Sequence, residues 1–166
     1  MRAASAFLLC ALLAACGAAP EPAAESALPA DVPALRDLGG IGGDFELTDQ
    51  RGEPFALQSL RGRAAMLFFG YTYCPDICPV TLSKMGRVYQ LLGERESELA
   101  ALFITVDPER DTAEKLAEYL DYFAIDAIGL GGSKEEIDGV IGQYGGHYSS
   151  DREEGQVADY LVDHST

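Results

Sequence analysis

The chain has few basic residues, and they are not clustered. Its 166 residues include 12 Lys and Arg against 27 Asp and Glu, which gives a formal net charge of −15. No cluster of five or more Lys or Arg occurs along the sequence. Nucleic-acid-binding proteins gather phosphates on clustered basic side chains, so we exclude a nucleic-acid partner. The acidity instead favours solubility and, as a further option, a basic partner.

The chain also lacks an apolar run long enough to span a bilayer comfortably. Its apolar stretch, Ala3–Ala15, follows a single Arg and suits the apolar core of a signal peptide. The stretch ends in Leu-Ala-Ala-Cys-Gly at residues 13–17, which resembles the bacterial lipobox. We therefore expect residues 1–15 to be a lipoprotein signal peptide and Cys16 to carry lipid. The alternative is a plain signal peptide in which Cys16 is incidental.

A lipid-anchored chain of this kind belongs in the cell envelope. Several acyl chains hold a protein stably on a membrane, whereas one does not. We expect the mature protein to be membrane-anchored and to face the periplasm or the outer membrane face. Residues 16–43 are rich in Ala, Pro and Gly without a sustained apolar period, which is typical of a flexible tether. Residues 44–166 then form one folded domain, and 48% of the chain is hydrophobic, which is enough for a core.

Local patterns in this domain predict an α/β fold. Residues 45–57 look like a β-hairpin around a turn at 49–52, and Ala65–Phe69 is an apolar run suited to a buried central strand with helices on both sides. Leu102–Val106 is a second strand, and 156–163 is a less certain final one. Strands that alternate with helices are typical of parallel α/β units.

Three sets of apolar residues mark the helices by their spacing. The sets are Leu82, Met85, Tyr89 and Leu92; Leu116, Tyr119, Leu120 and Phe123; and Ile137, Val140, Ile141 and Tyr144. Two of the helices have a predicted capping box at their start, formed by Asp111 with Glu114 and by Ser133 with Glu136.

Cysteine is scarce, which limits the sites that the domain can build. Of four Cys, Cys10 leaves with the signal peptide and Cys16 is expected to carry lipid. Cys74 and Cys78 are then the thiols of the folded domain, and in an oxidising compartment they are either a disulfide or a ligand pair. An inert disulfide across so short a loop adds little stability in the chain-entropy description, which favours a working pair.

The position of the pair favours reactive sulfur. It follows a predicted strand and precedes a helix that should begin near Pro79. Sites in open α/β sheets form at the carboxyl ends of strands, and the positive end of a helix favours thiolate over thiol. We therefore expect Cys74 and Cys78 to be nucleophilic and able to bind metal at neutral pH.

Histidine is equally scarce, which restricts the metal. Soft sulfur ligands select Cu(I) or Zn(II), but a closed zinc site needs four protein ligands, and the domain offers two Cys and two His. His147 lies between glycines and Tyr148 and is interpreted as an ordinary surface or core residue. For His164, spacing alone does not decide whether it is a metal ligand. Two sulfurs and one imidazole give a three-coordinate site, which suits Cu(I).

Three blocks of sequence carry a family resemblance. Residues 70–79 (GYTYCPDICP), 106–112 (VDPERDT) and 162–165 (VDHS) closely resemble the signature blocks of the Sco/SenC family. Members of this family are thioredoxin-like copper proteins that help to assemble the copper centre of cytochrome c oxidase. The resemblance extends from about residue 43 to the end of the chain.

The resemblance implies a thioredoxin-like central sheet flanked by helices, with an N-terminal β-hairpin. It also implies that Cys74 and Cys78 are thiolate ligands and His164 the imidazole ligand of one copper ion. Three acidic residues of the same blocks are then expected near these ligands or facing a partner; they are Asp76, Asp107 and Asp111.

The chain departs from the family pattern at two places. Tyr73 stands where many members have His, which removes one further imidazole but none of the three main ligands. The family continues past its copper His with a strand and a terminal helix, whereas this chain stops two residues after His164. We therefore expect a C-terminal strand and helix to be missing from this sequence.

Three functions are consistent with these residues. A copper chaperone would pass copper to the copper-containing subunit of cytochrome c oxidase and receive it from another copper donor. A thiol-disulfide oxidoreductase would use Cys74 and Cys78 as its redox pair, keep the cysteines of the oxidase copper site reduced, and depend on a thiol reductant. A lipid-anchored structural module would use the pair as a staple. The spacing of the two cysteines and the presence of His164 favour the chaperone.

Overall fold

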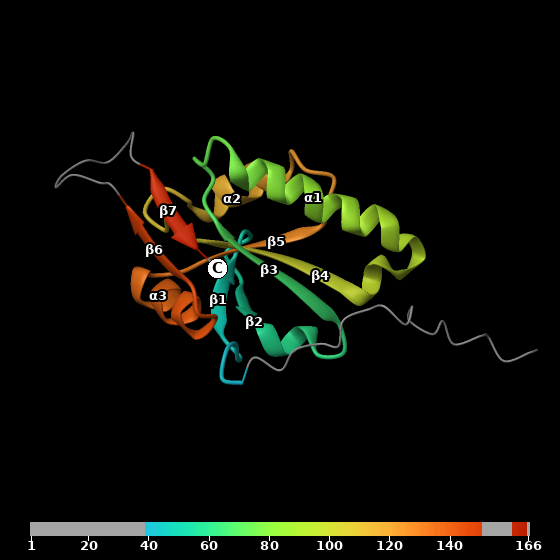
Figure 1. The fold of residues 1–166 in the computed structure, drawn as a ribbon, viewed down its shortest axis with the longest axis horizontal. Helices are drawn as coiled ribbons and strands as arrows, with labels where there is room; N and C mark the ends of the chain where they lie inside the picture. The colour runs from blue at the N-terminus through green and yellow to red at the C-terminus, as the bar shows by residue number, and fades with distance from the viewer. Residues whose placement is uncertain (1–38, 151–160, 166) are drawn as a thin grey trace, which may run out of the picture. The chain divides into compact units, whose positions relative to one another are not determined.

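A five-stranded sheet lies at the centre of the fold (Figure 1). The computed structural model describes residues 39–150 and 161–165, so the predicted signal peptide, Cys16 and most of the predicted tether lie outside the described residues. The strands are β1 (Glu46–Asp49), β2 (Pro54–Ala56), β3 (Ala64–Gly70), β4 (Leu99–Thr105) and β5 (Ala127–Gly131), in the spatial order β2-β1-β5-β4-β3. Strands β3, β4 and β5 are parallel, whereas β1 is antiparallel to β2 and β5. The predicted hairpin and the predicted α/β class are confirmed.

Helices connect the strands and cover both faces of this sheet. They are α1 (Ile77–Leu92), α2 (Ala113–Leu120) and α3 (Lys134–Gln143), with the 3₁₀ helices η1 (Leu57–Leu60) and η2 (Gly93–Glu98). A separate two-stranded sheet pairs β6 (His147–Ser150) with β7 (Val162–Ser165) in antiparallel register. Within the described ranges, no helix is long and apolar enough to cross a membrane.

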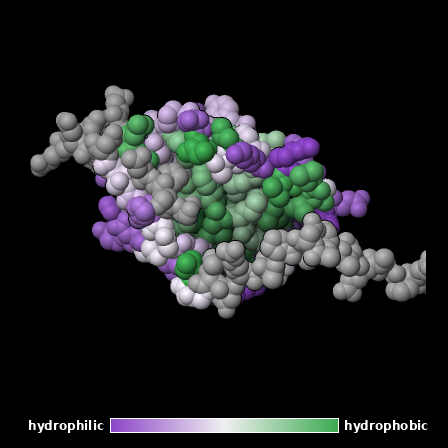
Figure 2. Space-filling model, in the orientation of Figure 1, coloured by the Kyte–Doolittle hydropathy of each residue, from purple (hydrophilic) through white to green (hydrophobic). Residues whose placement is uncertain are grey.

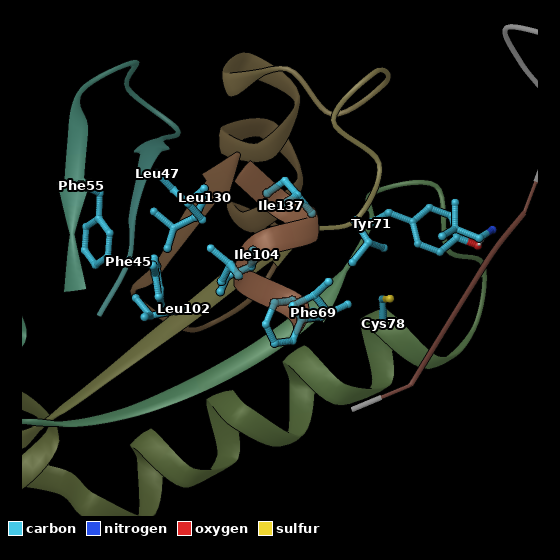
Figure 3. Packing of buried hydrophobic residues seen from close by; sticks show 14 of the residues in the cluster. Phe45, Leu47, Phe55, Phe69, Tyr71, Cys78, Leu102, Ile104, Leu130 and Ile137 are labelled. Carbon is cyan, nitrogen blue, oxygen red and sulfur yellow. Dashed lines mark hydrogen bonds between the residues drawn. The ribbon is translucent and has the colours of Figure 1, made fainter. Parts of the chain in front are cut away.

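Strand β4 divides the core into two clusters. Every residue of β4 is buried, and successive side chains of a strand point to opposite faces. Leu102 and Ile104 join the cluster that contains Ile137 of α3, as Figure 3 shows, whereas Phe103 joins the cluster beneath α1 and α2. The strand that is buried on both faces is thus β4, whereas the prediction placed it at 65–69.

Strand β3 does not occupy the central place that its apolar run predicts. It is the edge strand of the sheet in the part of the chain that the structure describes, and its first residues, Ala64 and Ala65, are exposed. Figure 2 shows hydrophobic side chains over this part of the surface. Hydrophobicity alone cannot separate an edge strand from a central one, because both bury apolar residues where helices cover them. The end of β3 at Phe69 and Gly70 is buried, and this end carries the site.

Strand β5 is an element that sequence patterns did not predict. Its two glycines lower its strand propensity. A Cβ on Gly129 would lie 2.8 Å from Leu120 Cδ1 and 3.2 Å from Leu116 Cβ, so glycine lets α2 pack closely on the strand. Glycine therefore weakens the strand pattern in the sequence and also permits the close packing of α2 on β5.

The two predicted capping boxes have different outcomes. Ser133 and Glu136 form both hydrogen bonds of a capping box at α3, as predicted. The prediction for Asp111 is wrong, because α2 begins one residue later and Thr112 is its N-cap, with its hydroxyl accepting from Lys115 N–H. Asp111 is instead buried against other partners.

The final strand also differs from its prediction. It was expected over 156–163, but β7 begins at Val162, and it pairs with β6 rather than with the main sheet. Residues 151–160 lie outside the described part of the chain. The backbone of residue 164 is paired with Tyr148, so the third signature block lies in a strand.

Candidate metal centre

The cysteine loop connects the buried end of β3 to the first turn of α1. Cys74 precedes the helix, and Cys78 is its second residue. The Cys74 N–H donates a 3.2 Å hydrogen bond to the Tyr71 carbonyl, which closes a tight turn. Asp76 is exposed at the N-cap of α1 and makes no side-chain capping bond. The prediction that both sulfurs lie at the N-terminal end of this helix is confirmed.

The two thiols lie next to each other and are not joined in a disulfide. They share a hydrogen bond, and the Tyr71 backbone N–H donates a second one to the Cys78 sulfur. Cys78 is fully buried, whereas 9% of Cys74 is exposed. Cys74 is therefore the thiol that an incoming group would meet first.

Gly70 makes room for the buried sulfur. A Cβ at this position would lie 3.0 Å from Cys78 Sγ and 2.8 Å from the Phe103 ring. Figure 3 shows Cys78 on α1 beside the end of β3, with Tyr71 next to it. The sheet and the first turn of α1 thus hold the thiol pair from both sides.

Burial opposes the ionisation of Cys78. Desolvation raises its pKa to about 12, against the smaller lowering effect of the Tyr71 N–H bond. The expectation that the helix terminus favours thiolate is therefore wrong for Cys78 in the absence of metal. A bound soft metal reverses this preference, because a coordinating thiol is deprotonated.

The second signature block is tied to the cysteine loop through Asp111. The Thr72 N–H donates to its carboxylate at 3.0 Å and the Thr72 hydroxyl at 2.6 Å, while the Thr105 hydroxyl donates at 2.7 Å. Asp111 is 4% exposed, and burial raises its pKa. Of the two roles expected for Asp111, burial excludes the partner-facing one, and the residue instead lies beside the cysteine loop, where it fixes the segment that precedes Cys74.

Asp107 and Arg110 form a second tie between the same segments. Arg110 Nε donates to the buried Asp107 carboxylate, and the guanidinium lies 4.7 Å from the centroid of the Tyr73 ring and 5.9 Å from that of Tyr71. Asp107 is therefore not a partner-facing group either. Arg110 joins the second block to the aromatic residues that flank Thr72.

The third block reaches the cysteine loop through the backbone of β7. The Val162 N–H donates a 3.2 Å hydrogen bond to the hydroxyl of Tyr71. His164 follows two residues later in β7, and its side chain lies outside the description. His147 is exposed at the start of β6, which agrees with its interpretation as an ordinary surface residue. All three blocks thus meet at Tyr71 and Thr72.

The ligand set can be tested against the described side chains. Among them, no three His, Cys, Asp or Glu side chains gather into a complete metal site. Cys74 and Cys78 provide two adjacent soft donors, which fit Cu(I) better than a hard cation. His164 stays a prediction as the third ligand.

Sequence analysis missed several residues that build this site. Tyr71, Thr72 and Arg110 act through partners far away in the chain, whereas Thr105 donates to Asp111 in the next segment. Tyr71, Thr72 and Arg110 belong to the quoted blocks, whereas Thr105 directly precedes the second block. Beside the loop, Tyr73, Tyr119 and Tyr122 line a surface cavity of about 210 Å³ with Thr72, Lys115 and Glu118.

The sequence of this chain is similar to those of known proteins. The sequence profile described as SCO1/SenC matches residues 34–166. The SCO2-like protein of Rickettsia felis is 39% identical over 142 residues, which cover 86% of this chain and 69% of that protein. The mitochondrial SCO1 homologue of Mus musculus is 44% identical over 127 residues, which cover 75% of this chain but 44% of the mouse protein.

A solved structure confirms the fold. The structure of Bradyrhizobium japonicum ScoI with copper bound superimposes with a TM-score of 0.69 and 40% identity, covering 75% of this chain and 78% of that one. The thioredoxin-like α/β fold that the resemblance implied is therefore confirmed.

Proposed function

Because the chain belongs to the SCO1/SenC family, we propose that it is a copper chaperone that holds one copper ion through Cys74, Cys78 and His164. It would pass this ion to the copper-containing subunit of cytochrome c oxidase and so assist assembly of the oxidase copper centre. The observation that carries the proposal is the pair of adjacent, unbridged thiols at the start of α1. The copper-bound ScoI structure, 40% identical, supports copper as the metal.

The thiol pair has the properties that copper binding and transfer require. Its two sulfurs are soft donors, and a third ligand from β7 would leave one face of the ion open to an incoming group. Cys74 is at the surface side of the pair, while Cys78 is fully buried beside Gly70. Transfer by ligand exchange would therefore begin at Cys74.

A titration with Cu(I) tests the proposal. The full chain is reduced and titrated without oxygen against a chromophoric competing chelator, beside Cys74→Ser, Cys78→Ser and His164→Ala. We expect one tightly bound equivalent, which is lost in both serine variants and weakened at least tenfold in His164→Ala. Ser83→Ala, a change in the exposed part of α1, is the matched control and should bind like the unaltered chain. A folded chain that ignores copper would refute the proposal.

A second candidate function is supported by the unequal exposure of the two thiols. Cys74 could attack a partner disulfide and form a mixed disulfide with release of one partner thiolate. Cys78 would then attack the Cys74 sulfur, which releases the second partner thiol and leaves this chain oxidised. An experiment separates the two functions, because His164→Ala should weaken copper binding but spare disulfide exchange with an oxidised model peptide.

We also propose that Cys16 anchors the protein to a membrane in the cell envelope. The support is the Leu-Ala-Ala-Cys sequence at the end of the apolar stretch. Cells that produce the full chain should incorporate labelled fatty acid into it, and Cys16→Ser should abolish this label. Equal labelling of both chains would refute the anchor.

A further inference from the structure

Tyr71 connects the cysteine loop to the strand that carries the third signature block. Its hydroxyl accepts a hydrogen bond from the Val162 N–H at 3.2 Å, between residues 91 positions apart in sequence. Tyr71 is 3% exposed, and Val162 is also buried. A buried bond between a side chain and a strand backbone fixes the position of that strand, because a buried donor without its acceptor is costly.

The main chain of Tyr71 contacts both cysteines. Its N–H donates to the Cys78 sulfur, and its carbonyl accepts from the Cys74 N–H. One residue therefore touches Cys74, Cys78 and β7 through three separate groups. Figure 3 shows Tyr71 on the side of the buried cluster where Cys78 lies.

We propose that Tyr71 is a positioning residue that sets the distance between β7 and the thiol pair, and with it the place of His164. The proposal rests on the proposed function, since it gives His164 the role of copper ligand. An extended strand rises by about 3.3 Å per residue, so the backbone of residue 164 lies within about 7 Å of the fixed Val162 amide. Freeing Val162 would let that backbone drift.

A second contact holds β6, the strand that pairs with β7. The Tyr148 hydroxyl donates to Asp138 of α3 at 2.6 Å, and Lys134 donates to the same carboxylate at 2.7 Å. The Tyr148 bond ties β6 to α3, to which Lys134 also belongs, whereas the bond at Val162 ties β7 to the cysteine loop. Strand β7 is thus attached directly at Val162 and, through its pairing with β6, at Tyr148.

The first test needs no metal. Amide hydrogen exchange is measured on the reduced full chain, on Tyr71→Phe and on Tyr73→Phe. Tyr71→Phe keeps the buried ring and removes the oxygen, so the Val162 amide should exchange roughly two- to tenfold faster than in the unaltered chain. Tyr73→Phe removes a hydroxyl from a half-exposed ring in the same loop and should leave this rate unchanged.

Exchange of the β4 amides serves as the internal reference for folding. It should stay the same in all three chains, and if it rises, the Val162 rate is compared with it rather than with the unaltered chain. Unchanged relative protection of Val162 in Tyr71→Phe would overturn the proposal.

The second test is a double-mutant cycle on Cu(I) affinity. Tyr71→Phe should raise the dissociation constant about three- to tenfold in the unaltered background and less than twofold in the His164→Ala background, because it acts through His164. Equal losses in both backgrounds, or none in either, would overturn the positioning role. If the unaltered chain binds no copper, the proposed function fails, and the exchange test alone still shows whether Tyr71 holds β7.

Discussion

Thr72 and Asp111 are joined by two hydrogen bonds, one from the Thr72 backbone and one from its hydroxyl, both to the same buried carboxylate. This pair fixes the segment two residues before Cys74 to the segment that follows β4. The carboxylate also accepts from Thr105, the last residue of that strand. The geometry of the cysteine loop therefore depends on a group that is not itself a metal ligand.

Removing this carboxylate should destabilise the fold. Asp111→Ala leaves three donors on Thr72 and Thr105 without their acceptor, and we expect a loss of about 1 to 3 kcal/mol in the free energy of unfolding. Asp111→Asn keeps one carbonyl oxygen and should lose less. Urea unfolding at neutral pH measures both, and an alanine variant as stable as the asparagine variant would contradict this account.

Asp111 also makes stability depend on pH. Burial raises its pKa above the usual value of 3.8, so the folded chain binds this proton more tightly than the unfolded chain. The stabilisation that comes from this bound proton is complete below the pKa that Asp111 has in the unfolded chain. It is lost as the pH rises through the higher pKa of Asp111 in the folded chain. The stability of the unaltered chain minus that of Asp111→Asn should therefore fall from acid toward neutral pH. A constant or rising difference would contradict the direction of the shift.

The two thiols should differ in reactivity. Cys78 is fully buried, and its pKa is raised to about 12, whereas part of Cys74 is exposed. Since thiolate is the reactive form, iodoacetamide should modify Cys74 at least about tenfold faster than Cys78 in the reduced chain. Peptide mass spectrometry separates the two sites, and Cys74→Ser and Cys78→Ser give the rate of each thiol alone. Faster modification of Cys78 would contradict this account, because it would mean that Cys78 is the more accessible thiol in solution.

Loss of Arg110 should cost far more than loss of a surface arginine. Arg110→Ala leaves the buried Asp107 carboxylate without its ion-pair partner, which should destabilise the fold by about 3 to 5 kcal/mol. Arg95→Ala removes an exposed pair with Glu98 and should have no measurable effect. Thermal unfolding of both variants provides the comparison, and similar midpoints would contradict the role given to Arg110.

Two glycines should respond in opposite directions to alanine. Gly129→Ala forces a Cβ against Leu120 and Leu116 and should destabilise by about 1 to 3 kcal/mol. Gly139→Ala lies on α3 with no atom near its new Cβ and should stabilise by about 0.5 to 1 kcal/mol. Urea unfolding of the two variants checks the sign, and a tolerated Gly129→Ala would show that α2 can move away from β5.

Local features were predictable from sequence, and long-range ones were not. The hairpin at β1 and β2 and the capping box at Ser133 depend on residues a few positions apart, and both agree with the structure. Asp111 and Thr112 are adjacent, and both residue types cap helices, so the sequence could not show that Asp111 is used elsewhere. Its true partner, Thr72, is 39 positions away.

At the site, too, local features were predictable from the sequence and long-range ones were not. The position of Cys74 and Cys78 at a strand-to-helix junction follows from local pattern and is confirmed. The raised pKa of Cys78 follows from its enclosure by the sheet, which only the assembled fold creates. No spacing rule relates Tyr71 to Val162, since their contact depends on where β7 pairs.

The contacts around the cysteine loop join residues at very different separations along the chain, and this affects the order in which the contacts form during folding. Two thiols four positions apart can meet in a chain that has no tertiary structure, since closing so short a loop costs little entropy. The bond between Tyr71 and Val162 spans 91 positions and waits for most of the sequence to be made and arranged. In the presence of an oxidant, the cysteine pair of a newly made chain can thus form a disulfide well before β7 reaches Tyr71. Reductant supplied early in biosynthesis should therefore matter more than reductant supplied to the finished protein.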